Sequence, residues 1–271
     1  MILIACIKQV PDTTQVKIDP VTNTLVRDGI PIIMNPYDTH ALEAALQLKD
    51  RFGGTVVALS MGPPNTEQTL RKALAAGADK AILLSDRVFG GADTLATSKV
   101  LATAIEKINR DMGEVGIVIC GKQTIDGDTA QVGPGIAVRL GYQQLTLVDA
   151  VVEADFNQKN LTVSRKLEGR HEKVFSPLPA VLTVVREMNR PRYPTVPKRL
   201  KAQGAPVEIW DNSVLQLDPN TIGLKGSPTW VSKIFSPERD KGEIVGDGLR
   251  DVDGTVKALL SKLHEKDLLP L

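Results

Sequence analysis

Carboxylates, a hydroxyl, an amide and several glycines are concentrated in one short loop of this sequence, between Cys120 and Ala137. The loop follows the apolar run Gly116–Ile119, which predicts a buried strand, and precedes apolar positions that predict a helix starting near Thr129. A strand, a polar loop with glycines and a helix N-terminus together are typical of a phosphate or nucleotide site. An ordinary turn capped by Asp128 or Thr129 explains the same residues equally well, so the loop alone leaves both interpretations open.

A second loop of similar composition follows the strand predicted over residues 80–84. Gly90 and Gly91 precede Asp93 and Thr94, at the start of a helix predicted over residues 94–108. Backbone N–H groups in such a position can bind a phosphate. The alternative is a helix that is merely capped by Asp93 or Thr94.

The motifs of common catalytic machinery are absent. The sequence has no G-x-S-x-G motif, no G-x-x-x-x-G-K-[ST] motif and no G-x-G-x-x-G after its first strand. His40, His171 and His264 lack the spacing of metal ligands, and Cys6 and Cys120 are predicted to be buried, reduced thiols. We therefore predict no catalytic residue and no metal site, and a protein whose ligand supplies the chemistry.

The elements that must position these loops alternate along the first half of the chain. Strands are predicted over residues 2–10, 55–61, 80–84 and 116–119, and helices over 35–52, 66–76 and 94–108, the first with Asn35 as its N-cap. This alternation predicts an α/β fold with a doubly wound, mostly parallel sheet, Rossmann-like or adenine-nucleotide-hydrolase-like. The loops after the four strands begin at Pro11, Gly62, Asp86 and Gly121. They should meet at one edge of the sheet, where ligands bind, and this favours a nucleotide site.

The pattern changes after Leu147. Strands are predicted over residues 148–154, 161–166 and 180–185, either extending the sheet or forming an antiparallel flap, and a hairpin is predicted earlier, over 16–33. We predict two parts: a nucleotide-binding domain over residues 1–204, and an arm with a C-terminal helix over 205–271. The helix, near residues 254–266, is expected to pack on another subunit, with packing on its own domain as the alternative.

Composition limits the classes of function. The 271 residues are 42% hydrophobic and carry 33 basic and 32 acidic side chains, a net charge of +1. This balance gives no indication of nucleic acid or an anionic membrane as the main partner. No apolar run approaches the ~20 residues of a membrane span, and the start of the chain does not resemble a signal peptide. We expect a cytoplasmic protein without membrane insertion.

Five segments, taken in order, resemble the beta subunit of electron-transfer flavoprotein. They are KQVPDT at Lys8–Thr13, MNPYD at Met34–Asp38, SMGP at Ser60–Pro63, GKQTIDGDTAQVG at Gly121–Gly133 and NRPRYPTVP at Asn189–Pro197. RKLEG at Arg165–Gly169, followed by SPLPAVLTV, resembles the signature stretch of the family. Arg170 departs from that stretch, because the family commonly has an acidic residue or glycine there.

The resemblance implies a heterodimer with an alpha subunit that carries FAD. In most mitochondrial-type members the beta subunit holds AMP, whereas in electron-bifurcating members the same site holds a second FAD. Gly127–Thr129 and the loop Gly90–Ser98 resemble the bifurcating group, and Gly127 would let a flavin approach the backbone closely. By resemblance, NADH would give a hydride to this FAD, which would pass electrons to the alpha-subunit FAD and to ferredoxin or flavodoxin. The chain would then be the electron-transfer subunit of an NADH-oxidising flavoprotein complex.

Two alternatives stay open. One is a non-bifurcating beta subunit, in which AMP has a structural role. The other is a nucleotide-binding sensor or ATP-pyrophosphatase domain with no redox role, although the Ser-Gly-Gly-x-Asp-Ser loop of the pyrophosphatases is absent.

The resemblance assigns the cofactor contacts residue by residue. The predicted contacts are Val10, Asp12, Ser60, Gly62, Asp86, Gly91, Ala92, Asp93, Thr94, Thr97, Ser98, Cys120, Gly121, Gln123, Asp126, Gly127, Asp128, Thr129, Ala130, Gln131, Val132 and Gly133. Amides near Gly91, Ala92 and Thr129 and the hydroxyls of Thr94, Thr97, Ser98 and Thr129 are expected at the pyrophosphate. Asp12, Gln123 and Asp126 are expected at the ribityl, adenosine or ring portions. Asp93 and Asp128 are expected to cap helices or hold ribose hydroxyls, since carboxylates repel a pyrophosphate.

Three further residues are assigned to partner proteins by the resemblance. Tyr37 is expected to contact the alpha-subunit flavin, with a plain core aromatic as the alternative. Tyr193 and Val196 lie in a loop at residues 190–200 that is expected to dock a flavin-containing dehydrogenase, with Val196 as an apolar anchor. The alternative is a linker with an incidental exposed valine.

Overall fold

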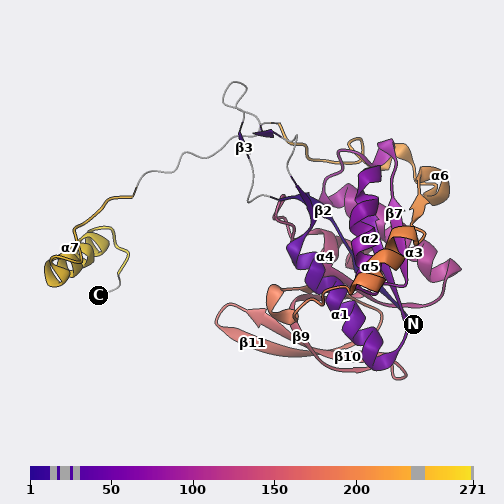
Figure 1. Cartoon of the computed structure of the whole chain (residues 1–271), viewed down its shortest axis with the longest axis horizontal. Helices are drawn as coiled ribbons and strands as arrows, with labels where there is room; N and C mark the ends of the chain where they lie inside the picture. The colour runs from indigo at the N-terminus through magenta and orange to yellow at the C-terminus, as the bar shows by residue number, and fades with distance from the viewer. Residues whose placement is uncertain (13–16, 19–24, 27–30, 233–241, 270–271) are drawn as a thin grey trace. The chain divides into compact units, whose positions relative to one another are not determined.

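The computed structural model describes residues 1–12, 17–18, 25–26, 31–232 and 242–269. The chain divides into two compact units, Met1–Ser232 and Lys233–Leu271, and each is described by itself. The first unit is a central sheet flanked by helices (Figure 1).

The described part of the first unit contains a nine-stranded sheet. Its strands are β1 (Ile2–Cys6), β6 (Thr55–Met61), β7 (Lys80–Leu84), β8 (Val115–Gly121), β9 (Gln143–Asp155), β10 (Asn160–Leu167), β11 (Arg170–Pro177), β12 (Ala180–Val184) and β13 (Glu208–Trp210). They lie in the order β11-β10-β9-β12-β8-β1-β6-β7-β13. The pairs that β10 forms with β9 and β11 are antiparallel, and the other pairs of this sheet are parallel. This confirms the predicted doubly wound, mostly parallel α/β fold.

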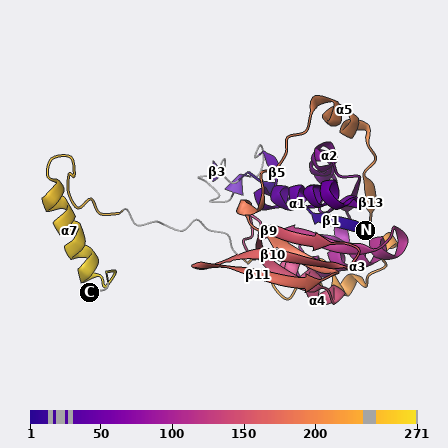
Figure 2. The ribbon, with the colours of Figure 1, turned by 90° about the horizontal axis from the view of Figure 1, so that it is seen from below.

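Helices cover both faces of the sheet. The bounds are α1 (Pro36–Phe52), α2 (Glu67–Ala76), α3 (Thr94–Asp111), α4 (Val132–Leu140), α5 (Val196–Gly204) and α6 (Asn212–Leu215), with 3-10 helices at Pro64–Thr66, Arg87–Phe89, Arg186–Met188 and Pro219–Thr221. Figure 2 shows α1 and α2 on one side of the sheet and α3 and α4 on the other. Side chains of β1 alternate between the two cores: Leu3 and Ala5 pack with α1 and α2, whereas Ile4 and Cys6 pack with α3 and α4.

Short two-stranded pairs lie outside the main sheet. β2 (Gln9–Pro11) pairs antiparallel with β5 (Ile32–Met34), and β3 (Lys17–Ile18) pairs antiparallel with β4 (Leu25–Val26). The β3–β4 pair agrees with the hairpin predicted over residues 16–33, most of which lies outside the described residues.

The sheet is wider than the sequence predicts at both edges. β9, β10 and β11 extend it as an antiparallel meander, and β11 was not predicted because most of its residues are polar or exposed. At the opposite edge β13 pairs with β7, so residues 205–232 belong to the first unit, whereas the predicted boundary lay at residue 204. β13 has three residues, which are too few to show the alternation of apolar and polar side chains that predicts a strand. Its last residue, Trp210, is buried in the core.

The described part of the second unit contains α7 (Val252–Glu265), close to the predicted helix. Asp251 caps it by accepting a hydrogen bond from the N–H of Gly254 at 2.9 Å. Val256, Leu259 and Leu260 on this helix are exposed. Its packing on another subunit stays a prediction.

Candidate functional site

A cavity of about 380 Å³ opens at the carboxyl ends of the central strands. Cys6, the last residue of β1, and Cys120, near the end of β8, both line it. β1 and β8 are neighbours at the point where the strand order reverses, because the chain adds β6 and β7 on one side of β1 and β8 on the other. The cavity therefore lies at the switch point where doubly wound sheets bind ligands.

Most of the predicted contact residues line this cavity. They are Gly62, Gly91, Ala92, Asp93, Thr94, Thr97, Cys120, Gly121, Gln123, Gly127, Thr129, Ala130, Gln131, Val132 and Gly133. They come from the end of β8, from the loops after β6, β7 and β8, and from the first turns of α3 and α4. Three of the four loops that were expected to converge are thus represented, and the residues just after β1 complete the wall.

Seven predicted contact residues lie away from the cavity lining. Val10 is buried in the core, and Asp12 donates its N–H to the carbonyl of Pro31 at 2.8 Å. The hydroxyl of Ser60 is buried, and the hydroxyl of Ser98 donates to the Leu95 carbonyl at 2.9 Å.

The other three are carboxylates. Asp86 accepts hydrogen bonds from the N–H groups of Val88 and Asn212, at 3.1 and 3.0 Å, and so ties the loop after β7 to α6. Asp126 pairs with Lys8 at 2.6 Å, and Asp128 accepts from the Gln123 side chain at 2.7 Å. These carboxylates shape the loops around the cavity.

Asp38, which was not among the predicted site residues, joins the two strands that flank the switch point. Its carboxylate accepts the N–H of Lys8 at 2.7 Å and the N–H of Gly121 at 3.1 Å. Burial raises the pKa of Asp38 to about 7, and those hydrogen bonds oppose the rise. A Cβ on Gly121 would lie 2.3 Å from the Asp38 carboxylate, so this glycine allows the close approach. Asp38 is the last residue of the MNPYD segment, and the family resemblance of that segment was the sequence feature that could have identified it.

Asn35 precedes α1 as predicted, but its side chain makes no capping hydrogen bond. It instead donates to the carbonyl of Gln123 at 2.9 Å and accepts from the N–H of Ile125 at 3.3 Å. A side chain at the start of α1 thus holds the loop after β8, and no local sequence pattern indicates such a contact.

The loop between β8 and α4 contains two residues with a left-handed backbone. Asp128 and Ala130 have positive φ values of 52° and 56°, so the helix cannot begin at Thr129 as predicted and begins at Val132. Gln131 precedes α4 without a capping hydrogen bond from its side chain; its amide oxygen accepts from the Thr94 hydroxyl at 3.0 Å. The first N–H groups of α4 are therefore left without a side-chain cap beside the cavity, an arrangement that favours an anion.

The loop before α3 is organised differently. Asp93 caps α3 by accepting the N–H groups of Leu95 and Ala96, each at 3.0 Å, as predicted. Burial opposes ionisation of Asp93, but the hydrogen bonds from Ala96 and Thr229 prevail and lower its pKa. The Ser227 hydroxyl accepts the Asp93 N–H at 2.8 Å, so the segment after Thr221 braces the Gly90–Asp93 loop.

The two cysteines are free and buried, which confirms that prediction. A hydrogen bond with Cys6, together with burial, raises the pKa of the Cys120 thiol well above its usual value. The Cys120 thiol is therefore a neutral part of the cavity wall and a poor nucleophile. Within the described residues, no group of three or more His, Cys, Asp or Glu side chains is placed to hold a metal ion.

The residues predicted to meet partner proteins lie outside the cavity lining. Tyr37 is partly buried, with the guanidinium of Arg186 4.8 Å from its ring centre. Tyr193 is 95% exposed and Val196 is 68% exposed. In the parts of the chain that are described, no helix has the length and apolar character needed to cross a membrane.

Comparison with known proteins agrees with this architecture. The family model "Electron transfer flavoprotein domain" matches residues 22–215. Protein FixA of Azotobacter vinelandii is 48% identical over 263 residues, covering 96% of this chain and 93% of the relative. The caffeyl-CoA reductase–Etf complex subunit CarD of Acetobacterium woodii is 46% identical over 272 residues, covering 99% of this chain and 100% of the relative.

The electron transfer flavoprotein subunit beta of Clostridium acetobutylicum is 45% identical over 266 residues, covering 97% of this chain and 99% of the relative. Membership of this family implies flavin-related electron transfer and an alpha-subunit partner within a redox complex. The chain belongs to the electron-transfer flavoprotein family and is an electron-transfer protein like its beta subunits.

Proposed function

We propose that this chain is the FAD-binding beta subunit of an electron-bifurcating electron-transfer flavoprotein. The observation that carries the proposal is Gly127 on the cavity wall. Gly127 has no left-handed backbone, and a Cβ built there would meet only Thr124 Oγ1 at 3.6 Å among the described residues. The fold itself gives no reason for glycine at this position, whereas close approach of a flavin ring or its ribityl chain does.

The groups around the cavity suit a dinucleotide. The first N–H groups of α4, at Val132 and Gly133, and the hydroxyls of Thr94 and Thr97 would hold the phosphates. Backbone amides near Gly91 would also face the phosphates, and Gln123 would contact the ribityl, adenosine or ring portions. The cavity volume of about 380 Å³ lies within the range of about 300–1,000 Å³ that is usual for cofactor sites.

The protein's own residues would bind and orient the cofactor and exclude water from it. Bound FAD would accept a hydride from NADH and pass electrons singly to the alpha-subunit FAD and to ferredoxin or flavodoxin. Hydride transfer needs no protein acid or base, so the thiols, hydroxyls and backbone amides of the lining would serve to bind and orient the cofactor. Asp38 holds the ends of β1 and β8 together beneath the ligand.

The rest of the chain would meet protein partners. Tyr37 would contact the alpha-subunit flavin, α7 would pack on the alpha subunit, and the exposed Tyr193 and Val196 would dock a flavin-containing dehydrogenase. We place the complex in the cytoplasm. The second candidate is a non-bifurcating beta subunit that holds AMP, which the same phosphate-binding groups favour.

The flavin content of the purified heterodimer tests the proposal. Two FAD per heterodimer, both bleached rapidly by NADH, are expected. One FAD and one AMP per heterodimer would replace the first candidate with the second. A heterodimer that keeps the alpha-subunit flavin but holds neither FAD nor AMP in the beta subunit would reject both candidate functions.

A further inference from the structure

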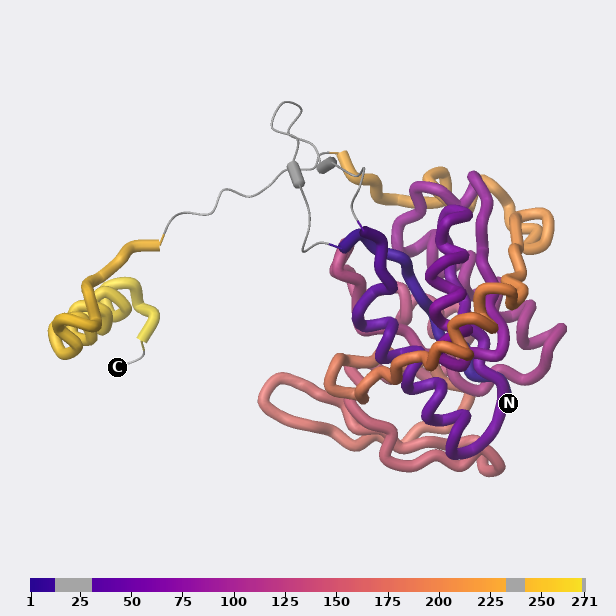
Figure 3. Tube along the Cα trace, viewed as in Figure 1, coloured from indigo at the N-terminus to yellow at the C-terminus, as the bar shows by residue number. Residues whose placement is uncertain are grey.

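The segment that contains Tyr193 and Val196 is fixed to the protein at each of its ends. It leaves the sheet after β12, crosses the layer of α1 and α2, and returns to the sheet at β13 (Figure 3). We define residues 193–201 as the pad. The pad includes the first turns of α5, and Val196 and Leu200 lie four residues apart on one face of that helix.

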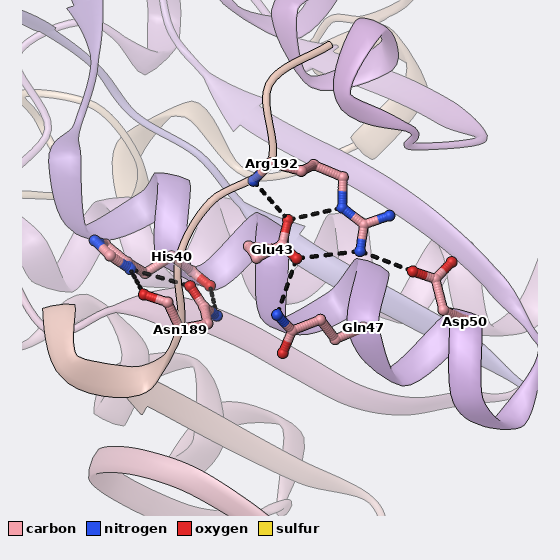
Figure 4. Close-up of polar contacts among 6 residues, drawn as sticks. All are labelled: His40, Glu43, Gln47, Asp50, Asn189 and Arg192. Carbon is pink, nitrogen blue, oxygen red and sulfur yellow. Dashed lines mark hydrogen bonds and ion pairs between the residues drawn. The ribbon is translucent and has the colours of Figure 1, made fainter. Parts of the chain in front are cut away.

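Arg192 fixes the first end of the pad to α1. Its Nε donates to Glu43 at 2.8 Å, its Nη2 donates to Glu43 at 3.1 Å and to Asp50 at 2.7 Å, and its backbone N–H also bonds Glu43 (Figure 4). Glu43 is only 4% exposed, and Gln47 donates a further hydrogen bond to it at 2.9 Å. These contacts hold the guanidinium pKa above its usual range, mainly through the bonds to Glu43.

A second pair of contacts supports the same end. The Asn189 side chain donates to the carbonyl of His40 at 2.9 Å, and its amide oxygen lies 3.0 Å from His40 Nδ1 (Figure 4). The Asn189 carbonyl lies 3.1 Å from the same nitrogen. Because both of these groups are acceptors, His40 Nδ1 must carry the proton.

Arg71 fixes the other end of the pad to α2. Its Nη1 donates to the carbonyls of Ala202, Gln203 and Ala205, at 3.0, 2.7 and 2.8 Å. These are carbonyls at the C-terminal end of α5, where a cation satisfies otherwise unpaired acceptors. Glu67, on the same helix as Arg71, holds the guanidinium in place through contacts of 2.5 and 3.1 Å.

Simple stabilisation of the fold does not explain this arrangement. A buried carboxylate such as Glu43 is costly unless it is fully paired, and replacement by apolar groups is often neutral or stabilising. The bonds at both ends restrain a segment whose apolar side chains face solvent: Tyr193 is 95% exposed, Val196 68% and Leu200 62%. A surface that is already ordered loses little conformational entropy when a partner binds, so the free energy of association is more favourable.

The charges of the pad and of the residues that flank it indicate the chemistry of the partner surface that it fits. Residues 190–206 contain five basic side chains and no acidic one. Arg190, Lys198, Arg199 and Lys201 make no ion pair with any described residue. The exposed surface is therefore an apolar centre with a cationic border, which is complementary to an apolar recess bordered by carboxylates.

We propose that Arg192 and Arg71 are positioning residues that hold the pad as a pre-formed surface for an apolar recess bordered by carboxylates on a partner protein. The inference rests on the docking role proposed above, and it adds how the surface is held and what it fits.

The test uses the intact heterodimer and a purified flavin-containing acyl-CoA dehydrogenase as the probe. Two variants release the pad: Arg71→Met, and the double variant Glu43→Leu/Arg192→Leu, which leaves no buried unpaired carboxylate. Arg199→Leu is the matched control, because it removes one pad charge and no anchoring contact. Hydrogen exchange of peptides covering residues 193–204 is measured without the probe, and kcat and KM for the probe are measured with it.

Both releasing variants should speed exchange of the pad about tenfold and raise KM about tenfold, with kcat at saturating probe retained. Arg199→Leu should leave exchange unchanged, and higher salt should raise the wild-type KM. Wild-type exchange in both releasing variants, or faster exchange with unchanged KM, overturns the inference. Because the exchange is read without the probe and does not depend on which nucleotide the heterodimer holds, its result is separate from the flavin count that tests the proposed function.

Discussion

Lys8 and Asp126 are 118 positions apart in the sequence, yet the Lys8 ammonium lies 2.6 and 2.8 Å from the two carboxylate oxygens of Asp126. The contact joins the segment after β1, where Lys8 lines the cavity, to the loop after β8. Burial opposes ionisation of Asp126, but the hydrogen bonds from Lys8 and Thr124 prevail and lower its pKa. Both side chains are partly exposed, so the pair contributes at most about 1 kcal/mol to stability, and its main effect is to place the loop.

Lys8→Met should weaken binding at the cavity more than it weakens the fold. It removes the contact that places the loop after β8 and leaves the Asp126 carboxylate without its ammonium partner, so affinity for an anionic nucleotide should fall on the order of tenfold. Nucleotide retained by the purified heterodimer and the Kd for its re-addition measure the effect. In Lys8→Met/Asp126→Asn affinity should return toward wild type, and failure to return would contradict the electrostatic explanation.

Thr129→Arg should expel the nucleotide from the cavity and leave the alpha-subunit flavin bound. Thr129 lines the cavity, and an arginine there would occupy the volume that the ligand needs. Nucleotide content per heterodimer, measured after denaturation, is the readout. Gln158→Arg, in the exposed turn between β9 and β10, is the control and should have wild-type content. An unchanged content in Thr129→Arg would refute the placement of the site.

Val196→Asp should impair electron transfer to the flavin-containing dehydrogenase and spare NADH oxidation by an artificial dye. The substitution puts a carboxylate into the apolar centre of the pad and, by like-charge repulsion, against an acidic border. We expect KM for the dehydrogenase to rise at least tenfold. Val138→Asp, on the exposed face of α4, is the matched control, because Val138 is 77% exposed. Equal loss of both activities in Val196→Asp would argue against docking.

Asp38 should make the stability of the fold depend on pH. Its pKa is about 7 in the folded protein against 3.8 for a free carboxyl, so the folded state holds a proton that the unfolded chain releases. The resulting stability is fully present below about pH 4 and is lost as pH rises to about 7. The difference between these two pKa values corresponds to about 4 kcal/mol of stability.

The free energy of unfolding in urea, measured between pH 4 and 8, tests this dependence. The wild type should lose stability across that range, and Asp38→Asn should show a flatter profile because asparagine does not titrate. Profiles of equal slope for the two proteins would show that Asp38 does not titrate in this range.

Periodic features of the sequence were sufficient for the main architecture. The strands at residues 55–61 and 80–84 and the helices bounded by Gly53 and Gly77 agree with the prediction, since continuous apolar runs and left-handed glycines are local signals. The convergence of loops on one sheet edge followed from the alternation of strands and helices along the chain.

The missed features depend on contacts between distant segments. Asp38 and Lys8 reach the cavity only because β1 and β8 lie side by side, a pairing that no local pattern reports. The helix after β8 starts at Val132, three residues after the predicted start at Thr129, because Asp128 and Ala130 have positive φ values. The types of these two residues do not predict such a backbone conformation.

The segment between β12 and β13 begins and ends within the sheet, whose strand positions are set by other contacts. Its exposed side chains can therefore change without moving a strand or a residue of the cavity lining. If the cavity holds a nucleotide and this segment docks the partner, as proposed above, a family built on this plan can acquire a new redox partner while it keeps its nucleotide, or change its nucleotide while it keeps its partner. Partner choice and cofactor choice would then be separate modules of one small fold.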